Sequence, residues 1–508
     1  MCIVTWNVGN TQPDSRQLAA LLSDEVCQSC SLIAVGVQEC FYRCDGSNVR
    51  DAYDEDDEID PQQQQAVGGE DESSLSSSSS SSSSSDEACS WKQMLVSHMD
   101  PTHSVVATAV LQQIQLVVFV RRRDAHWIGN EKTMTEATGF ANMMGNKGAT
   151  VVAFHFKDTS FCFVNTHLAA HQDQTARRNA DANRIAANIV FDGREAVSSY
   201  DHVFWCGDLN YRLDLGGTER TPSAAVFDAI VGLVERREFE TLFATDQLSR
   251  ERALGHVFHG FDEATQHLLQ FAPTFKVVPR LPLHKSLSAA SLLTLPPPRR
   301  YNPQRSPAWC DRILFKSVRP NDIGVTAYSS VPEVTTSDHT PVRGVFRATV
   351  HAHRQRDGCV DGVDASMLSI FALRGWNLAI CDAASHSSDP YVVFSGDVLC
   401  SQVRTSVINK SLSPRWYERL EVPLRTGEEE DLLQSKVLVT VFDRDMLKHD
   451  DVIGYAQIPL SLLFDRGRSG STFFTVSLTR GGVCTGKLSG RLEMWWPRKL
   501  RRSRPKSF

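Results

Sequence analysis

The sequence predicts an α+β sandwich over about residues 1–349 and a smaller all-β sandwich after it. In the first region, apolar segments rich in β-branched residues alternate with amphipathic helical segments. From about residue 367, short strands separated by turn residues follow one another without a clear helix. The length of 508 residues is sufficient for two such domains.

The first region opens with two apolar strands, at residues 2–8 and 31–39, separated by a helical stretch. Residues 47–90 then interrupt the pattern with twelve acids and a run of ten serines. This segment is too polar to offset the entropy cost of ordering, so we expect a disordered surface insert. With twelve acids and one base, the insert carries a net charge of 1 − 12 = −11, and the whole chain carries −7. The remaining chain is therefore mildly basic (−7 + 11 = +4), which suits an anionic substrate or surface.

The first region continues to about residue 349, and a polar linker (350–366) separates it from the second sandwich. This sandwich occupies residues 367–482, and residues 483–508 form a last strand and a basic tail. In the first region we expect further strands at 104–122, 148–168, 201–213, 272–278, 309–317 and 339–350, and helices at 173–191, 223–236 and 239–251.

The chain shows no feature of a secreted or membrane-spanning protein. It has no run of about 18 apolar residues, and its first residues lack the basic and apolar regions of a signal peptide. Thirteen cysteines, an odd number scattered over the chain, are more typical of a reducing compartment than of a disulfide framework. The expected location is therefore the cytoplasm.

Polar side chains follow or interrupt several apolar strands of the first region. A single such residue usually caps a strand or forms a turn, but here carboxylates, amides and imidazoles recur together. A carboxylate such as Glu39 can bind Mg²⁺, which prefers oxygen ligands, and Asp208 could orient or deprotonate an attacking water. The pattern favours metal-dependent hydrolysis of a phosphate ester. The residues are Asn7, Glu39, Asn165, His167, Asp208, Asn210, Asp338 and His339.

Eight ordered motifs of this region resemble those of the inositol polyphosphate 5-phosphatases. The motifs are TWNV, VQE, MGNKGA, NTHLAAHQ, FWCGDLNYRL, APTFK, PAWCDRILF and SDHTPV. The resemblance implies a phosphoric monoester hydrolase with Mg²⁺ as cofactor, built on the four-layer αββα sandwich of the DNase I-like phosphoesterases. It places Asn7 and Glu39 at the metal and His167 at the scissile phosphate.

The resemblance also implies roles in catalysis and substrate binding. Asp208 would activate the water that Asn210 helps to position. Asp338 would orient His339, which completes the phosphate site. The multiply phosphorylated inositol ring would be contacted by Asn146, Lys147, Lys276 and Arg312, with Tyr211 and Arg212 near the pocket.

Three of these features have an alternative interpretation. Arg312 could form a buried ion pair with Asp311 or another core acid, and Lys276 could be a solvated lysine at a strand end. The insert at residues 280–305 mixes leucines with basic residues. It is either a flexible surface loop or a membrane-facing loop beside the active site.

The second sandwich resembles a C2 domain in its loops DAASHSSDPYVVF and VFDRDMLKHDDVIGYAQIPL. Ca²⁺ takes six to eight oxygen ligands, and five aspartates on two loops can supply most of them. The alternative is a C2 fold that serves as a scaffold without calcium. The resemblance implies calcium ligation by Asp382, Asp389, Asp443, Asp445 and Asp451, with Asp450 as an alternative to Asp451. Basic residues that could contact anionic lipid are Arg404, Lys410 and Arg415.

The expected function is Mg²⁺-dependent hydrolysis of the 5-phosphate of the phosphoinositides PI(4,5)P2 and PI(3,4,5)P3. Soluble inositol polyphosphates are alternative substrates. The C2 domain would make the enzyme a peripheral membrane protein, and tethering would raise the local substrate concentration. The competing hypotheses are a catalytically inactive, C2-type lipid-binding scaffold and a nucleic-acid phosphoesterase of the same superfamily, although no nucleic-acid partner is expected.

Overall fold

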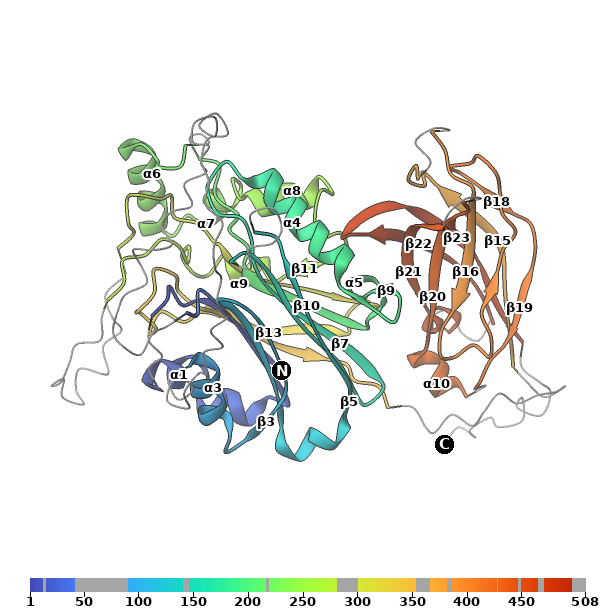
Figure 1. The fold of residues 1–508 in the computed structure, drawn as a ribbon, viewed down its shortest axis with the longest axis horizontal. Helices are drawn as coiled ribbons and strands as arrows, with labels where there is room; N and C mark the ends of the chain where they lie inside the picture. Colours follow the sequence, from blue (N-terminus) through green and yellow to red (C-terminus); the bar gives the residue numbers. More distant parts are fainter. Residues whose placement is uncertain are drawn as a thin grey trace, which may run out of the picture.

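The computed structural model describes most of the chain apart from the acidic, serine-rich insert. The described residues are 1–11, 15–41, 90–139, 146–215, 219–280, 300–352, 366–381, 386–426, 428–445, 449–464 and 470–495. The predictions for residues 47–89, for residues 281–299, for Asp382 and for the basic tail therefore lie outside the described residues. Figure 1 shows two β-rich units, of which the N-terminal one carries helices on its outer faces.

The N-terminal unit is built on two six-stranded sheets that pack face to face. The first sheet has the order β13 (Ile323–Ser330), β14 (Val342–Ala348), β1 (Cys2–Asn7), β2 (Leu32–Gln38), β4 (Ile114–Arg121) and β3 (His103–Leu111). The second has the order β11 (Asp262–Glu263), β12 (Asp311–Ser317), β10 (His202–Asp208), β7 (Thr159–His167), β6 (Gly148–Phe156) and β5 (Ile128–Ala137). Side chains of both sheets, such as Ile3 and Phe163, share one buried hydrophobic cluster.

Helices cover the outer face of each sheet. On the first sheet, Trp91 packs in a buried cluster with Val4, and on the second sheet Ile185 and Leu248 pack with Trp205. The helices over the first sheet are α1 (Ser15–Leu21), α2 (Asp24–Ser29) and α3 (Trp91–Met99). Those over the second are α4 (Thr175–Asn188), α5 (Ala196–Ser199) and α8 (Gln247–Ala253).

This arrangement forms four layers, αββα, and confirms the predicted DNase I-like sandwich (Figure 1). Since the central strands are covered on both faces, strands such as β1 and β7 are buried along their whole length. The remaining elements of this unit are α6 (Ala224–Glu235), α7 (Phe239–Phe243), α9 (Thr265–Leu268), the hairpin of β8 (Val190–Phe191) and β9 (Arg194–Glu195), and a 3₁₀ turn, η4 (Arg122–Trp127).

Two predicted elements of the first region differ from the structure. The single helix expected at 239–251 is two helices, because the Asp246 side chain accepts a hydrogen bond from the Ser249 backbone N–H at 2.8 Å and so begins α8 separately. The strand expected at 272–278 is an irregular segment with isolated bridges, one of which pairs Phe275 with Ala308.

The C-terminal unit is a β-sandwich around its own hydrophobic cluster. Its strand order is β17 (Val403–Arg404), β16 (Pro390–Ser395), β20 (Lys436–Asp443), β21 (Asp451–Pro459), β22 (Ser471–Arg480), β23 (Val483–Trp495), β15 (Met367–Trp376) and β18 (Arg415–Trp416), with β19 (Leu420–Pro423) also on β15. The expectation of no helix is wrong at α10 (Glu429–Gln434), where the fully buried Leu432 anchors the helix in the core, and at the 3₁₀ turn η7 (Leu460–Leu463).

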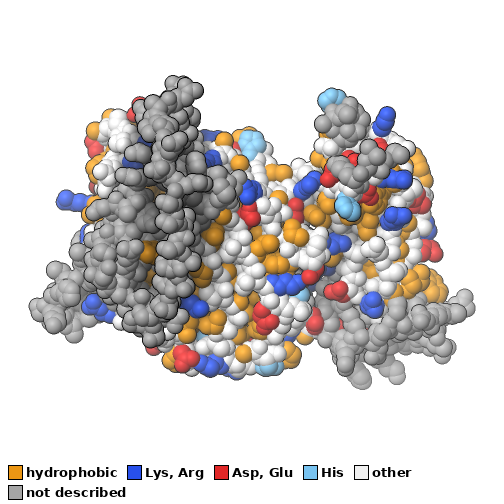
Figure 2. Space-filling view, in the orientation of Figure 1, with side chains coloured by type: hydrophobic (Ala, Val, Ile, Leu, Met, Phe, Trp, Pro, Cys, Tyr) orange, Lys and Arg blue, Asp and Glu red, His pale blue; other side chains and the backbone are white. Residues whose placement is uncertain are grey.

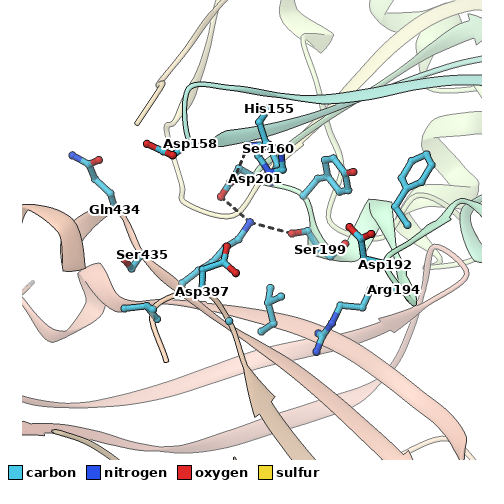
Figure 3. Close-up of a pocket in the computed structure, with 16 residues that line it drawn as sticks. His155, Asp158, Ser160, Asp192, Arg194, Ser199, Asp201, Asp397, Gln434 and Ser435 are labelled. Carbon is cyan, nitrogen blue, oxygen red and sulfur yellow. Dashed lines mark hydrogen bonds and ion pairs between the residues drawn. The ribbon is translucent and has the colours of Figure 1, made fainter. Parts of the chain in front are cut away.

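The two units contact each other through a polar interface. Lys436 Nζ donates hydrogen bonds to Asp201 Oδ1 at 2.8 Å and to the Ser199 backbone oxygen at 3.0 Å. The Gly481 N–H lies 3.1 Å from both carboxylate oxygens of Glu195. Residues of both units line a cavity of about 290 Å³. Figure 3 shows Asp201 and Ser199 among its lining residues. No residue predicted at the catalytic site lines this cavity.

The surface carries charged side chains of both signs, in line with the 53 basic and 60 acidic residues of the chain. Figure 2 shows basic and acidic side chains interspersed over the visible face of both units. Among the described residues, no helix combines the length and the apolar character that a transmembrane span requires.

Candidate functional site

The polar residues of the candidate site meet because the strands that carry them end at the same edge of the sandwich. The parallel pair β1 and β2 aligns Asn7 with Gln38, so that Glu39 follows immediately. In the facing sheet, the parallel pair β7 and β10 aligns His167 with Asp208. Parallel neighbours present their carboxyl ends at one edge, and the face-to-face packing of the sheets brings the two edges together.

Asn7 connects the carboxylates of the two sheets. Its Nδ2 donates hydrogen bonds to Glu39 Oε1 at 3.0 Å and to Asp208 Oδ2 at 3.1 Å. His167 Nε2 lies 3.4 Å from Asp208 Oδ2 and 3.9 Å from Glu39 Oε1. Four residues from four strand ends, predicted separately from four motifs, therefore form one group.

The turns that follow the strands place two residues in the left-handed backbone region. Glu39 has φ 52° and Asn210 has φ 56°. Residues other than glycine adopt this conformation at a cost on the order of 1 kcal/mol, and such positions cluster at functional sites. At Asn210 the conformation turns the chain back, so that its backbone N–H donates to Asp208 Oδ1 at 3.1 Å.

The Asn210 side chain is held from both sides. Its Nδ2 donates to the Leu168 backbone oxygen at 3.0 Å, and its Oδ1 accepts a hydrogen bond from Arg212 Nη2 at 2.5 Å. Arg212 is itself buried and lies over the Phe275 ring at 4.3 Å. Arg212 therefore supports Asn210 from the protein side, in the neighbourhood of the site as predicted.

The carboxylate that orients His339 is Asp311, and the assignment of this role to Asp338 is wrong. His339 Nδ1 lies 2.9 Å from Asp311 Oδ2, and Thr274 donates a hydrogen bond to the same oxygen at 2.6 Å. Asp338 instead pairs with Lys276, whose Nζ lies 3.1 Å from its Oδ2. Asp311 is the first residue of β12, which pairs Asp311 with Asp208 across the sheet, so its carboxylate reaches the site by cross-strand pairing.

Asp311 and Thr274 are site residues that the sequence reading missed. Asp311 stands in the quoted motif PAWCDRILF, and Thr274 stands in APTFK. The signal available for Asp311 was its place at the start of a strand beside the β10 motif. Sequence adjacency favoured Asp338 because it directly precedes His339.

Burial and neighbouring charge divide the titratable groups into two kinds. Burial alone would lower the pKa of His339, but Asp311 and Asp208 outweigh it and raise this pKa to about 9. Burial would raise the pKa of Asp208, but the two histidines lower it below its usual value. Burial raises the pKa of Asp311, despite its hydrogen bond to His339. At neutral pH the charge on His339 therefore offsets part of the negative charge of the two buried aspartates.

His167 and Glu39 respond mainly to burial. Burial, followed by the nearby Lys147, lowers the pKa of His167 to about 3, so its ring is neutral at neutral pH. Burial raises the pKa of Glu39, and Lys147 partly opposes this effect. Lys147 Nζ lies 3.2 Å from His167 Nε2.

Two of the predicted substrate-binding residues are not available to a substrate. The Arg312 guanidinium is fully buried and pairs with Asp246 at 3.0 Å and with Glu263 at 2.6 Å, which corresponds to the alternative interpretation, an ion pair with core acids. Tyr211 is also fully buried, and its hydroxyl donates to Asn179 Oδ1 at 2.6 Å. Both side chains therefore support the fold rather than the pocket.

The other predicted substrate-binding residues stay near the group. Lys147 and Lys276 flank it through His167 and Asp338 respectively. Asn146 has a buried Oδ1 that accepts no hydrogen bond from the part of the chain that the structure describes. These three side chains can present donors and positive charge to a phosphorylated ligand.

The donor set around Glu39 fits a hard cation better than the group around His339. Glu39 is half-buried beside Asn7, and burial disfavours the charged form of its carboxylate. A bound cation would favour this charged form. The oxygens of Asp208 and Asp311 and a nitrogen of His339 also lie within 4.8 Å of one another. A protonated imidazole cannot ligate a metal, so the raised pKa of His339 disfavours this second group as the metal site.

The predicted calcium ligands that the structure describes gather at one end of the C-terminal sandwich. Asp443 ends β20 opposite Asp451 at the start of β21, and its Oδ1 accepts a hydrogen bond from the Asp389 N–H at 2.5 Å. Burial raises the pKa of Asp443, and the nearby Asp445 and Asp389 add to this effect. Asp450 accepts a hydrogen bond from the Tyr391 hydroxyl at 2.6 Å, which occupies one of its oxygens. Such a cluster of carboxylates suits a cation.

Comparisons with known proteins cover both units. A family model described as endonuclease/exonuclease/phosphatase family 2 matches residues 4–345, and a C2 domain model matches residues 366–476. Phosphatidylinositol 3,4,5-trisphosphate 5-phosphatase 2 of Canis lupus familiaris is 36% identical over 257 residues, which are 49% of this chain and 19% of that protein. Phosphatidylinositol 3,4,5-trisphosphate 5-phosphatase 2B of Danio rerio is 29% identical over 424 residues, which are 79% of this chain and 31% of that protein.

The chain thus spans less than a third of the length of these curated relatives. Among solved structures, it is similar to the inositol polyphosphate 5-phosphatase domain of spSynaptojanin in complex with inositol (1,4)-bisphosphate and calcium ion. The identity is 23%, the match covers 69% of this chain and 84% of that chain, and the TM-score is 0.49.

Proposed function

Since the chain belongs to endonuclease/exonuclease/phosphatase family 2, we propose that its N-terminal unit hydrolyses the 5-phosphate of phosphoinositides, with PI(4,5)P2 and PI(3,4,5)P3 as substrates. The observation that carries the proposal is the convergence of Asn7, Glu39, His167, Asp208 and His339 at one edge of the sandwich. The curated relatives are named as phosphatidylinositol 3,4,5-trisphosphate 5-phosphatases, which supports this substrate class.

Asp208 is the group that takes a proton from the attacking water. Its lowered pKa keeps the carboxylate ionised at neutral pH, so it can accept a proton. The Asn210 N–H holds Oδ1, which leaves Oδ2 facing His167 at 3.4 Å and His339 at 3.7 Å. Asn210 would in addition position the water, because Leu168 and Arg212 fix its amide.

His339 is the donor that stabilises charge on the phosphoryl group. Its Nδ1 is committed to Asp311, so Nε2 is the atom that can donate to a phosphoryl oxygen. The raised pKa keeps the ring protonated at neutral pH. His167, neutral and beside Lys147, would contact the same phosphate from the end of β7 in the facing sheet.

Glu39, with Asn7 held against it, would bind Mg²⁺. When bound, the ion would offset charge on the phosphoryl group and on the leaving oxygen. The other phosphates of the inositol ring would be met by Asn146, Lys147 and Lys276, since clustered cations form charge-assisted hydrogen bonds to phosphate.

The C-terminal unit would recruit the enzyme to a membrane. We propose that Asp389, Asp443, Asp445 and Asp451, together with Asp382, bind Ca²⁺, since the first four cluster at one end of the sandwich. The enzyme would then be a peripheral protein at the cytoplasmic face of a membrane, where its substrate is concentrated.

Phosphate release from vesicles that contain PI(3,4,5)P3 tests the proposed function. We expect Asp208→Asn to lower kcat by about 10³-fold, because it removes the proton acceptor without changing the side-chain volume. The matched control is Asp262→Asn, the same change at an exposed acid of the same sheet, which should act like the unmodified chain. Equal release by both variants would remove Asp208 from the mechanism.

The same preparation distinguishes the competing hypotheses. A scaffold would release no phosphate from any phosphoinositide, with or without Mg²⁺. A nucleic-acid phosphoesterase would cleave a duplex that contains an abasic site. A panel of phosphoinositides and soluble inositol polyphosphates then defines which ring phosphates are required.

A further inference from the structure

Arginine and aromatic side chains cover the solvent-facing side of one half of the C-terminal sandwich. Cross-strand pairing places Arg491 of β23 between Phe371 of β15 and Phe473 of β22. In the next row, Arg374 lies opposite Arg415 of β18. Directly paired residues point to the same side of a sheet. We define the arginine–aromatic face by Phe371, Arg374, Trp376, Arg415, Phe473 and Arg491.

The aromatic rings of this face are exposed to an unusual extent for large apolar side chains. Phe473 is 75% exposed and Trp376 is 38% exposed, whereas Leu488 and Leu492, on the other side of β23, are fully buried. Trp495 at the end of β23 is 50% exposed, and Tyr417, next to β18, is 88% exposed. Clustered exposed aromatic residues mark a binding surface more often than an inert one.

The arginines lie over the rings. The Arg374 guanidinium carbon is 3.2 Å from the centre of the Trp376 ring, and that of Arg491 is 5.3 Å from the Phe473 ring. Arg419, which is next to the face, lies 4.3 Å above Phe371. Stacking keeps the guanidinium groups close to the apolar surface while their N–H groups still point outward.

The face is basic. Its neighbouring acids, Glu421 and Glu493, both pair with Arg419. Within the described part of the chain, no carboxylate forms an ion pair with Arg374, Arg415 or Arg491. These three guanidinium groups therefore remain available for an anionic partner.

Two further observations indicate how extended the partner is. The sequence that follows Trp495 carries six Lys and Arg residues among its last eleven and no acid, which adds positive charge to this end of the chain. The face also extends over four strands, β15, β18, β22 and β23, whereas Asp389 and Asp443 lie at the ends of β16 and β20. A broad, planar partner that accepts both phosphate contacts and aromatic side chains is a lipid surface, since arginine pairs with phosphate and aromatic rings settle at the headgroup level.

We propose that the arginine–aromatic face binds the anionic surface of a phospholipid bilayer without calcium. The proposal rests on the proposed function only for its setting at a membrane. It requires neither the calcium ligands nor catalysis, so a failure of the 5-phosphatase proposal leaves it intact. A binding assay therefore tests it separately from phosphate release.

The test is sedimentation of the full chain with vesicles in the presence of a calcium chelator. We expect the chain to sediment with vesicles that contain about 30% phosphatidylserine, and not with vesicles of phosphatidylcholine alone. Because each basic residue near an anionic surface contributes about fivefold to partitioning, Arg374→Glu and Arg415→Glu should each weaken binding about tenfold or more. Phe473→Ala, at an exposed position that does not support the core, should weaken it several-fold.

The matched control is Arg347→Glu, the same charge reversal at an exposed position of β14 in the N-terminal unit. It should sediment like the unmodified chain. Equal losses in Arg347→Glu and Arg374→Glu would show a general charge effect and overturn the proposal, as would binding that depends wholly on calcium. Tight binding of soluble polyglutamate at this face, without vesicle binding, would assign it to an acidic protein instead.

Discussion

Replacing Arg312 with methionine should destabilise the N-terminal unit and leave substrate binding almost unchanged. The guanidinium and its two partner carboxylates, on Asp246 and Glu263, are all fully buried, with contacts between 2.6 and 3.0 Å. Methionine fills most of the volume but leaves two carboxylates buried without their counter-charge. Breaking a buried ion pair in this way costs about 3–5 kcal/mol.

That loss is a large part of a typical domain stability of about 5–15 kcal/mol. For a unit of this size it corresponds to a fall in the unfolding midpoint on the order of 5–10 °C. Thermal unfolding followed by tryptophan fluorescence measures the change. Assays well below the midpoint should show a KM close to that of the unmodified chain, because the side chain does not reach the pocket.

Lys276→Met is the matched control, since it removes one positive charge at a partly exposed position that pairs with Asp338. It should leave the unfolding midpoint within about 1–2 °C and raise KM about tenfold, because it removes a charge-assisted contact to the substrate. The reasoning would be refuted if Arg312→Met unfolded at the usual temperature and raised KM as Lys276→Met does.

Three further predictions follow from buried charges. Asp311→Asn should shift the alkaline limb of kcat/KM to lower pH by on the order of 1 unit, because Asp311 raises the pKa of His339; an unchanged pH profile would contradict this. Burial raises the pKa of Glu195 from 4.5 to about 7, so folding gains stability from this group below pH 4.5 and loses it as the pH rises to 7. Glu195→Gln should therefore reduce the pH dependence of the unfolding midpoint between these pH values. An unchanged pH dependence would show that it comes from other groups. Lys436→Met leaves Asp201 buried at the interface and should lower the unfolding midpoint by several degrees, whereas Lys410→Met, at an exposed lysine of the C-terminal unit, should not.

Much of the fold could be predicted because hydrophobic patterns are local. The apolar runs at residues 2–8 and 31–39 became β1 and β2, and Ser223 caps α6 where the helix was expected to begin. The errors arose where a tertiary contact decides the local structure. Asp246 divides two helices since its side chain both caps α8 and pairs with Arg312.

The composition of the candidate catalytic group could also be predicted, because most of its members directly follow a recognisable strand. The hydrogen bonds within this group could not be predicted, since they depend on which strands become neighbours. Asp338 is adjacent to His339 in sequence, yet the chain turns its carboxylate toward Lys276. Asp311 is 28 residues away, and only the pairing of β12 with β10 brings it to the imidazole.

The motif PAWCDRILF shows why a motif beside an active site need not touch the substrate. Its Asp311 holds His339, its Arg312 ties β12 to β11 and α8, and the Trp309 indole N–H donates to the Phe271 backbone oxygen at 3.1 Å. All three side chains are fully buried. The motif therefore supports the imidazole of His339, and changes within it should alter stability and the pH profile before they alter KM. A basic residue in a phosphate-binding family thus becomes a candidate ligand only after the acids that surround it in the fold have been counted.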